Sequence, residues 1–136
     1  MNIYFACSIT GGRQDEKIYG EIVRFLQSQG HDVPSAVFAL PRDVDENAMN
    51  PVEVYQRDTQ WISECDVLIA EVTTPSHGVG YEIGYALHVG KPVLCLHRRS
   101  VDISKMITGN PDINLRVVDY KSWEEVEGKL QAFLET

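Results

Sequence analysis

Two carboxylates with different surroundings stand out in this chain of 136 residues. Glu82 lies among closely spaced glycines in residues 76–84. We expect it in the first turn of a helix, whose positive end stabilises an ionised carboxylate. Asp58 falls on the apolar stripe of a predicted helix, so it is either paired with Arg57 or backbone amides, or held in a cleft that favours proton donation. The cleft is the preferred interpretation. One ionised and one proton-donating carboxyl group can cleave a glycosidic bond through a covalent intermediate.

A loop rich in small residues is a candidate anion site. After the apolar run of residues 3–7, the chain continues Ser8-Ile-Thr-Gly-Gly-Arg13 and then enters a helical pattern. The two glycines let the backbone approach a ligand closely, and the N-terminus of the following helix attracts phosphate. Alternatively, the glycines only start the helix and the arginine pairs with Asp15 or Glu16.

The same loop contains a second possible reaction centre. Cys7 and Arg13 match the C-x5-R pattern of tyrosine phosphatases, in which the cysteine attacks phosphorus and the arginine binds the oxygens. Low-molecular-weight phosphatases also share a flavodoxin-like layout. However, Gln14 follows the arginine where Ser or Thr is usual, and no Asp-Pro pair supplies a general acid. This hypothesis therefore ranks second.

Strand and helix patterns alternate along the chain and predict one domain covering residues 1–136. Strands are expected at residues 3–7, 33–40, 67–72, 93–96 and 115–118. Helices are expected to end before Gly30, and to cover residues 51–64, 79–89, 104–108 and 122–134. The pattern indicates an α/β fold, a three-layer flavodoxin-like (Rossmann-like) open sheet of five parallel strands in the order 2-1-3-4-5, with helices on both faces.

This topology places the two loops that are richest in Gly, Ser and Thr, residues 8–13 and 73–80, across one crevice. Ligands of open α/β sheets bind beyond the carboxyl ends of the strands, where the strand order reverses. Here that point lies between the first and third strands. The glycines at positions 78, 80 and 84 do not match G-x-G-x-x-G, which disfavours a dinucleotide cofactor.

Composition excludes several other classes of function. The 12 Lys and Arg against 20 Asp and Glu give a net charge of -8, which disfavours nucleic acids and membrane surfaces as partners. No apolar stretch approaches the roughly 20 residues of a spanning helix, and we expect no signal peptide. Three cysteines without a CxxC pair argue against a disulfide framework and a zinc site, and fit a reducing cytoplasm. The histidines also lack metal-ligand spacing, so we expect no metal.

Five segments in order carry a family resemblance: residues 4–13, 58–61, 66–73, 75–84 and 104–109. Through them the chain resembles the 2'-deoxynucleoside 5'-phosphate N-hydrolases of the nucleoside 2-deoxyribosyltransferase superfamily. The resemblance implies that Glu82 attacks the anomeric carbon of deoxyribose and that water hydrolyses the glycosyl-enzyme. It implies that Asp58 orients the nucleophile or assists protonation of the departing base. No cofactor is needed for this chemistry.

The resemblance also implies the remaining site residues. Tyr4 and Ile9 would lie against the sugar, with Ile9 disfavouring a 2'-hydroxyl. The 5'-phosphate would be held by the hydroxyls of Ser8 and Ser76 and the amide of Gly78. The residue types of the glycine-rich loop, rather than the resemblance, add Thr10, Gly11, Gly12 and Arg13 to the expected substrate site. A homodimer is implied because a serine matching Ser104 reaches the neighbouring subunit's site. Met106, in the same segment, is also expected to bind the substrate.

Two departures from the family pattern bear on phosphate binding. Thr10 stands where the animal enzymes have an arginine, and Cys7 replaces a glycine. Weaker phosphate selectivity would move the protein toward the sister activity, the transfer of deoxyribose between bases. A nucleotide-binding module without catalysis is the third alternative.

Overall fold

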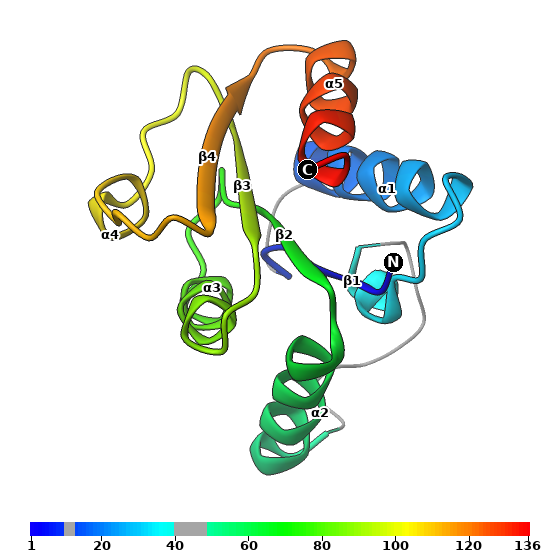
Figure 1. The fold of residues 1–136 in the computed structure, drawn as a ribbon, viewed down its shortest axis with the longest axis vertical. Helices are drawn as coiled ribbons and strands as arrows, with labels where there is room; N and C mark the ends of the chain where they lie inside the picture. The colour runs from blue at the N-terminus through cyan, green and yellow to red at the C-terminus, as the bar shows by residue number, and fades with distance from the viewer. Residues whose placement is uncertain (10–12, 40–48) are drawn as a thin grey trace.

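A parallel β-sheet with helices on both faces forms the centre of the molecule in a computed structural model that describes residues 1–9, 13–39 and 49–136 (Figure 1). Within these residues the sheet has four strands in the order β1-β2-β3-β4, and each neighbouring pair is parallel. The strands are β1 (Ile3–Ala6), β2 (Val67–Glu71), β3 (Val93–Arg98) and β4 (Leu115–Tyr120). This is the expected order with one expected strand left out.

The strand predicted at residues 33–40 is wrong. Pro34–Phe38 forms a 3-10 helix, η1. Apart from the ladders between the four strands, the described residues contain one isolated bridge, between Asn2 and Asp32. Proline lacks the N–H that a strand ladder requires, which favours this outcome. The side chain of Ser35 replaces the missing strand, because its Oγ accepts from Phe5 N and donates to Phe5 O, both at 2.9 Å. Residue 40 lies outside the described chain.

The helices begin and end close to the predicted positions. They are α1 (Arg13–Ser28), α2 (Pro51–Glu64), α3 (His77–His88), α4 (Lys105–Thr108) and α5 (Trp123–Leu134). The side chain of Asn50 caps α2 ahead of Pro51, and Ser122 forms the predicted capping box with Glu125 at the start of α5. Gly30 and Gly90 follow α1 and α3 with φ of 88° and 81°, the left-handed conformation that ends many helices.

Alternate side chains of the strands enter two separate cores. Ile3 and Phe5 of β1 pack with α1 and α5, whereas Tyr4 and Ala6 pack with α2 and α3. Figure 1 shows the corresponding layers, with α1 and α5 on one side of the sheet and α2 and α3 on the other. Both faces of the sheet are therefore covered, as predicted for buried parallel strands.

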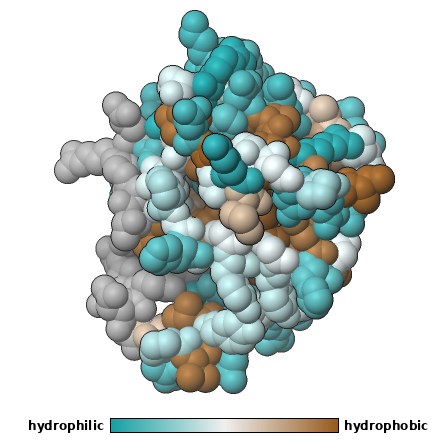
Figure 2. All heavy atoms as spheres, turned by 90° about the vertical axis from the view of Figure 1, so that its left-hand side faces the viewer, coloured by the Kyte–Doolittle hydropathy of each residue, from teal (hydrophilic) through white to brown (hydrophobic). Residues whose placement is uncertain are grey.

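The surface mixes hydrophilic and hydrophobic residues on the side where α4 lies (Figure 2). Met106 of α4 is 85% exposed, and Ile113 in the segment before β4 is 95% exposed. In the described part of the chain, no helix is both long and apolar enough to span a bilayer.

Candidate active site

A cavity of about 730 Å³ opens where β1 ends, between α2 and α3. Six of the predicted site residues contribute to its walls: Tyr4, Ile9, Asp58, Ser76, Gly78 and Glu82. The cavity thus lies beside β1, whose Tyr4, Phe5 and Ala6 line it together with Cys7 just beyond the strand. The predicted topology placed a ligand site beyond the carboxyl end of this strand. The cavity brings the end of β1, the middle of α2 and the start of α3 into contact with one space.

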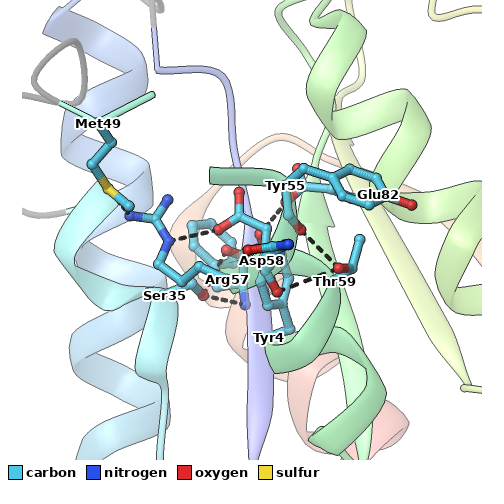
Figure 3. A network of polar contacts seen from close by, with 10 residues as sticks. Tyr4, Ser35, Met49, Tyr55, Arg57, Asp58, Thr59 and Glu82 are labelled. Carbon is cyan, nitrogen blue, oxygen red and sulfur yellow. Dashed lines mark hydrogen bonds and ion pairs between the residues drawn. The ribbon is translucent and has the colours of Figure 1, made fainter. Parts of the chain in front are cut away.

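Tyr4 and Glu82 form the central polar contact of the cavity. The hydroxyl of Tyr4, on β1, donates a hydrogen bond to Oε2 of Glu82, on α3 (Figure 3). Burial raises the pKa of Tyr4 well above its usual value, and the negative charges of Glu82 and Asp58 raise it further. The hydroxyl therefore keeps its proton and remains a hydrogen-bond donor. Since both carboxylates act on the same hydroxyl, they share one electrostatic environment.

The structure corrects the expected position of Glu82. Helix α3 begins at His77, so Glu82 lies in the second turn and the first turn holds no acidic residue. The field of a helix end falls off within its first turn. Glu82 therefore lies too far along α3 to be stabilised by the helix N-terminus, and it accepts a hydrogen bond from Tyr4.

Asp58 lines the cavity and is also paired with its neighbour. Arg57 Nε lies 2.9 Å from Asp58 Oδ1, and both side chains are 21% exposed. Arg57 Nη1 lies 2.9 Å from the sulfur of Met49, and its guanidinium stands 5.1 Å from the ring centroid of Trp61. Asp58 is thus paired with Arg57, as one alternative predicted, and also lines the cavity.

The start of α3 forms another wall of the cavity. Ser76 caps this helix by accepting from the backbone N–H of Val79 at 3.3 Å. A Cβ added at Gly78 would meet only Ser76 Oγ, at 3.9 Å, so a ligand can approach this backbone closely. Exposed backbone N–H groups at a helix N-terminus suit an anion.

The loop predicted to hold phosphate is described only in part. Ser8 is buried, and Ile9 is half-exposed at the cavity wall. Thr10, Gly11 and Gly12 lie outside the described residues, as does the side chain of Arg13, whose backbone begins α1. The first turn of α1 nevertheless lies beside the loop after β2, because the hydroxyl of Thr74 donates to Asp15.

A buried polar network holds the loop that follows β2. Asp15, one expected partner of Arg13, accepts from Arg98 Nη1 at 2.8 Å. Glu71 accepts from the amide and hydroxyl of Thr73 at 2.6 and 2.9 Å and from the hydroxyl of Tyr120. Burial raises the pKa of Glu71, and these hydrogen bonds offset the rise only in part. The network joins the carboxyl ends of β2, β3 and β4.

Ser104 and Met106 do not line the cavity of this chain. Ser104 Oγ accepts from the backbone N–H of Met106 at 3.2 Å and caps the short helix α4. The side chain of Met106 points into solvent. In this chain the two residues are therefore outside the cavity that Tyr4, Asp58 and Glu82 line.

The apolar wall contributed by α2 was missed by the sequence analysis. Together with Asp58, its members follow the i, i+3, i+4, i+7, i+8, i+11 spacing of one helix face: Pro51, Val54, Tyr55, Thr59 and Ile62. This spacing was the signal that could have found them, because it also contains Asp58. Tyr81, next to Glu82, closes the wall, with its hydroxyl 3.4 Å from that of Tyr55. Nothing in the local sequence distinguishes Tyr81 from an ordinary surface residue.

The three cysteines are all buried, and none of them forms a disulfide. Cys7 lines the cavity, whereas Cys65 and Cys95 pack in the core as predicted. Burial raises the pKa of Cys95 to about 12. Within the described residues, no group of three or more His, Cys, Asp or Glu side chains could hold a metal ion.

A known protein family matches this chain along most of its length. The family model described as Nucleoside 2-deoxyribosyltransferase matches residues 3–122. This match assigns the domain to a class of enzymes that act on N-glycosidic bonds. The two carboxylates in the cavity suit that class. The chain belongs to the nucleoside 2-deoxyribosyltransferase family.

Several individual proteins of known name are similar to this chain in sequence or in structure. A 5-hydroxymethyl-dUMP N-hydrolase of Danio rerio is 44% identical over 140 residues, covering 100% of this chain and 97% of the relative. A protein of the same name from Mus musculus is 41% identical and covers 98% of this chain and 80% of the relative. The structure of Clostridium botulinum CMP N-glycosidase, BcmB, matches with a TM-score of 0.71 and 25% identity, over 95% of this chain and 97% of that one.

Proposed function

We propose that this protein hydrolyses the N-glycosidic bond of 2'-deoxynucleoside 5'-monophosphates, releasing a free nucleobase and 2-deoxyribose 5-phosphate. One observation carries the proposal: the Glu82 carboxylate accepts from Tyr4 inside a cavity that Asp58 also lines. Paired carboxyl groups flanking a sugar are the usual machinery of glycoside hydrolysis. Relatives along the whole chain carry the name N-hydrolase, which supports the same reaction class.

In the proposed reaction, Glu82 is the nucleophile. Its carboxylate forms a bond to C1' of the deoxyribose as the bond from C1' to the base nitrogen breaks, and the electron pair of that bond leaves with the base. Water then attacks C1' as the bond from C1' to the Glu82 oxygen breaks, and the water gives up a proton to solvent. The sugar phosphate is released and the carboxylate is restored. Tyr4 orients Glu82 through its hydrogen bond, and Asp58 orients the nucleophile or assists protonation of the base.

The cavity walls divide the proposed substrate into three parts. The 5'-phosphate lies at the start of α3, against Ser76 and Gly78, with Ser8 and the loop of residues 10–13 completing its site. The deoxyribose lies between Tyr4 and Ile9, where Ile9 opposes a 2'-hydroxyl. The base then faces the apolar residues of α2. No cofactor takes part in these steps.

The test is to incubate the purified protein with deoxynucleoside monophosphates, including 5-hydroxymethyl-dUMP, and with their ribose counterparts, including CMP. Unphosphorylated deoxynucleosides form a third set. The amounts of free base and inorganic phosphate that are released are measured by chromatography. Free base from the deoxy monophosphates alone is expected. Inorganic phosphate without free base would overturn the proposal in favour of Cys7 chemistry, and ligand-induced thermal stabilisation without any product would favour a binding module.

Transfer of deoxyribose to a second base is the alternative activity, and the description of the matching family favours it. Both reactions share the glycosyl-Glu82 intermediate and differ in whether water or a base attacks it. Adding an excess of a second free base to the assay separates them. Hydrolysis yields sugar phosphate at an unchanged rate, whereas transfer yields a new deoxynucleotide.

We also propose a homodimer in which Ser104 completes the site of the neighbouring subunit. Its support is the resemblance, together with the position of Ser104 outside its own cavity and the exposure of Met106 beside it. Light scattering after size exclusion should give twice the chain mass. Mixing inactive Glu82→Gln and Ser104→Ala proteins should restore activity, because one site of the mixed dimer then holds both native residues. Activity that stays absent in the mixture would contradict the shared site.

The three cysteines are buried and form no disulfide, which fits a reducing compartment, and we propose the cytoplasm as the place of action. Nucleic acids and membranes are not proposed as partners, because a net charge of -8 disfavours both. Cell fractionation with an antibody to the protein tests the location.

A further inference from the structure

Arg57 is held in place by three contacts beside the proposed catalytic centre. Its Nε lies 2.9 Å from Asp58 Oδ1, its Nη1 lies 2.9 Å from Met49 Sδ, and its guanidinium stands 5.1 Å from the Trp61 ring centroid. Figure 3 shows the side chain extended between Met49 and Asp58. Neighbouring positions on a helix normally point in different directions. The pair therefore requires Arg57 to turn toward Asp58, and the contacts with Met49 and Trp61 hold it in that orientation.

The orientation of Arg57 affects the ionisation of Asp58, because other charged groups lie close to that carboxylate. Glu82 faces the same cavity from α3, and both carboxylates act on the Tyr4 hydroxyl from β1. Two carboxylates in one partly buried site disfavour each other's ionised form, and a cation in contact with one of them reverses this effect. Arg57 is such a cation, and its effect on the Tyr4 hydroxyl is opposite to that of the two carboxylates.

We propose that Arg57 is a positioning residue that keeps Asp58 ionised beside Glu82, so that Asp58 acts as an anion and hydrogen-bond acceptor and not as the proton donor to the leaving base. The inference rests on the proposed function and decides between the two roles left open there for Asp58. An ionised Asp58 stabilises the positive charge that develops on the sugar as the glycosidic bond breaks. The proton that the departing base nitrogen gains then comes from solvent water.

The first measurement does not depend on activity. Protein labelled with ¹³C at aspartate carboxyl groups is titrated by NMR, with Asp58→Asn used to assign the Asp58 signal. Arg57→Gln is expected to move the Asp58 midpoint upward by about one pH unit or more, because an adjacent opposite charge is lost. Arg57→Lys keeps the charge without the planar fork and should leave the midpoint closer to that of the unmodified protein.

The matched control is Arg99→Gln. Arg99 pairs with Asp119 at 3.3 Å and with Glu125 at 3.0 Å on the surface, outside the walls of the cavity that Asp58 lines. This variant removes the same charge from the chain and should leave the Asp58 midpoint in place. Urea unfolding of each variant checks that it is folded. If Arg57→Gln does not fold, Arg57→Lys carries the test, with a smaller upward displacement expected.

The second measurement is the pH dependence of kcat for base release. In Arg57→Gln the acidic limb should move upward together with the Asp58 midpoint, so that kcat on this limb falls by about tenfold for each pH unit of displacement. A proton-donating Asp58 predicts the opposite, an activity lost as the pH rises through its midpoint. An active protein whose Asp58 midpoint is the same with and without Arg57 overturns the inference alone. A protein that releases no base from any nucleotide overturns the proposed function instead.

Discussion

The hydroxyl of Tyr4 donates a hydrogen bond to Oε2 of Glu82, across a separation of 78 positions in the chain. Tyr4 lies on β1 in the core, and Glu82 lies on the second turn of α3. The contact fixes the orientation of a carboxylate at the edge of a cavity, where a sugar can reach it. Its two partners are therefore the first targets for substitution.

Glu82→Gln is expected to lower the rate of base release by about 1,000-fold or more, because an amide cannot serve as the nucleophile. Gln has the same size and still accepts from Tyr4, so the fold should be unchanged. Cys7→Ser, which alters another residue of the same cavity, should retain most of the activity. Chromatography of the products checks both variants, and the reverse pattern would support phosphatase chemistry at Cys7.

Tyr4→Phe removes the donor to Glu82 and keeps the buried ring. We expect kcat to fall between about tenfold and a thousandfold, as when one donor to a reacting group is lost. Tyr85→Phe is the matched control, because the Tyr85 hydroxyl lies 3.3 Å from Ser63 Oγ and outside the cavity walls. Equal activity in the two variants would show that the contact between Tyr4 and Glu82 does not serve the reaction.

Gly78→Ala separates substrate contact from stability at the start of α3. An added methyl group meets only Ser76 Oγ at 3.9 Å, so the protein should fold and gain up to about 1 kcal/mol from the better helix propensity of alanine. The methyl group should nevertheless raise KM for the monophosphate, because it stands where the phosphate approaches the backbone. Gly84→Ala, also on α3 with open space around it, should gain stability without a change in KM.

Glu71 should give the protein a characteristic pH dependence of stability. Burial raises its pKa in the folded state above the value of 4.5 expected of an exposed glutamate. Between these two values the folded state binds more protons than the unfolded state, so this contribution to the unfolding free energy falls as pH rises.

Urea unfolding at a series of pH values tests this in the unmodified protein and in Glu71→Gln. The stability of the unmodified protein relative to the variant should decrease steadily as the pH rises above about 4.5. Glu64→Gln, at an exposed position at the end of α2, should run parallel to the unmodified protein. A Glu71→Gln curve that is also parallel would contradict the buried acid.

Local sequence patterns determined most of the fold. The apolar strands at β2 and β3, the proline and cap before α2 and the capping box before α5 are all local signals, and each was confirmed. The strand predicted at residues 33–40 failed because its apolar composition also suits a 3-10 helix, and Pro34 with the hydroxyl of Ser35 tips the balance. That choice depends on β1, which lies some 30 residues away.

The sequence by itself singled out Glu82 and Asp58 by residue type and placed them near the carboxyl edge of a parallel sheet. Only the tertiary structure decided which groups surround them: the Tyr4 hydroxyl on Glu82, the Arg57 guanidinium on Asp58 and the apolar face of α2 opposite. Periodicity predicts which face of a helix is buried, because it reflects local geometry. Side-chain partners depend on how separate elements pack and which rotamers they allow, and a single sequence carries no local record of these.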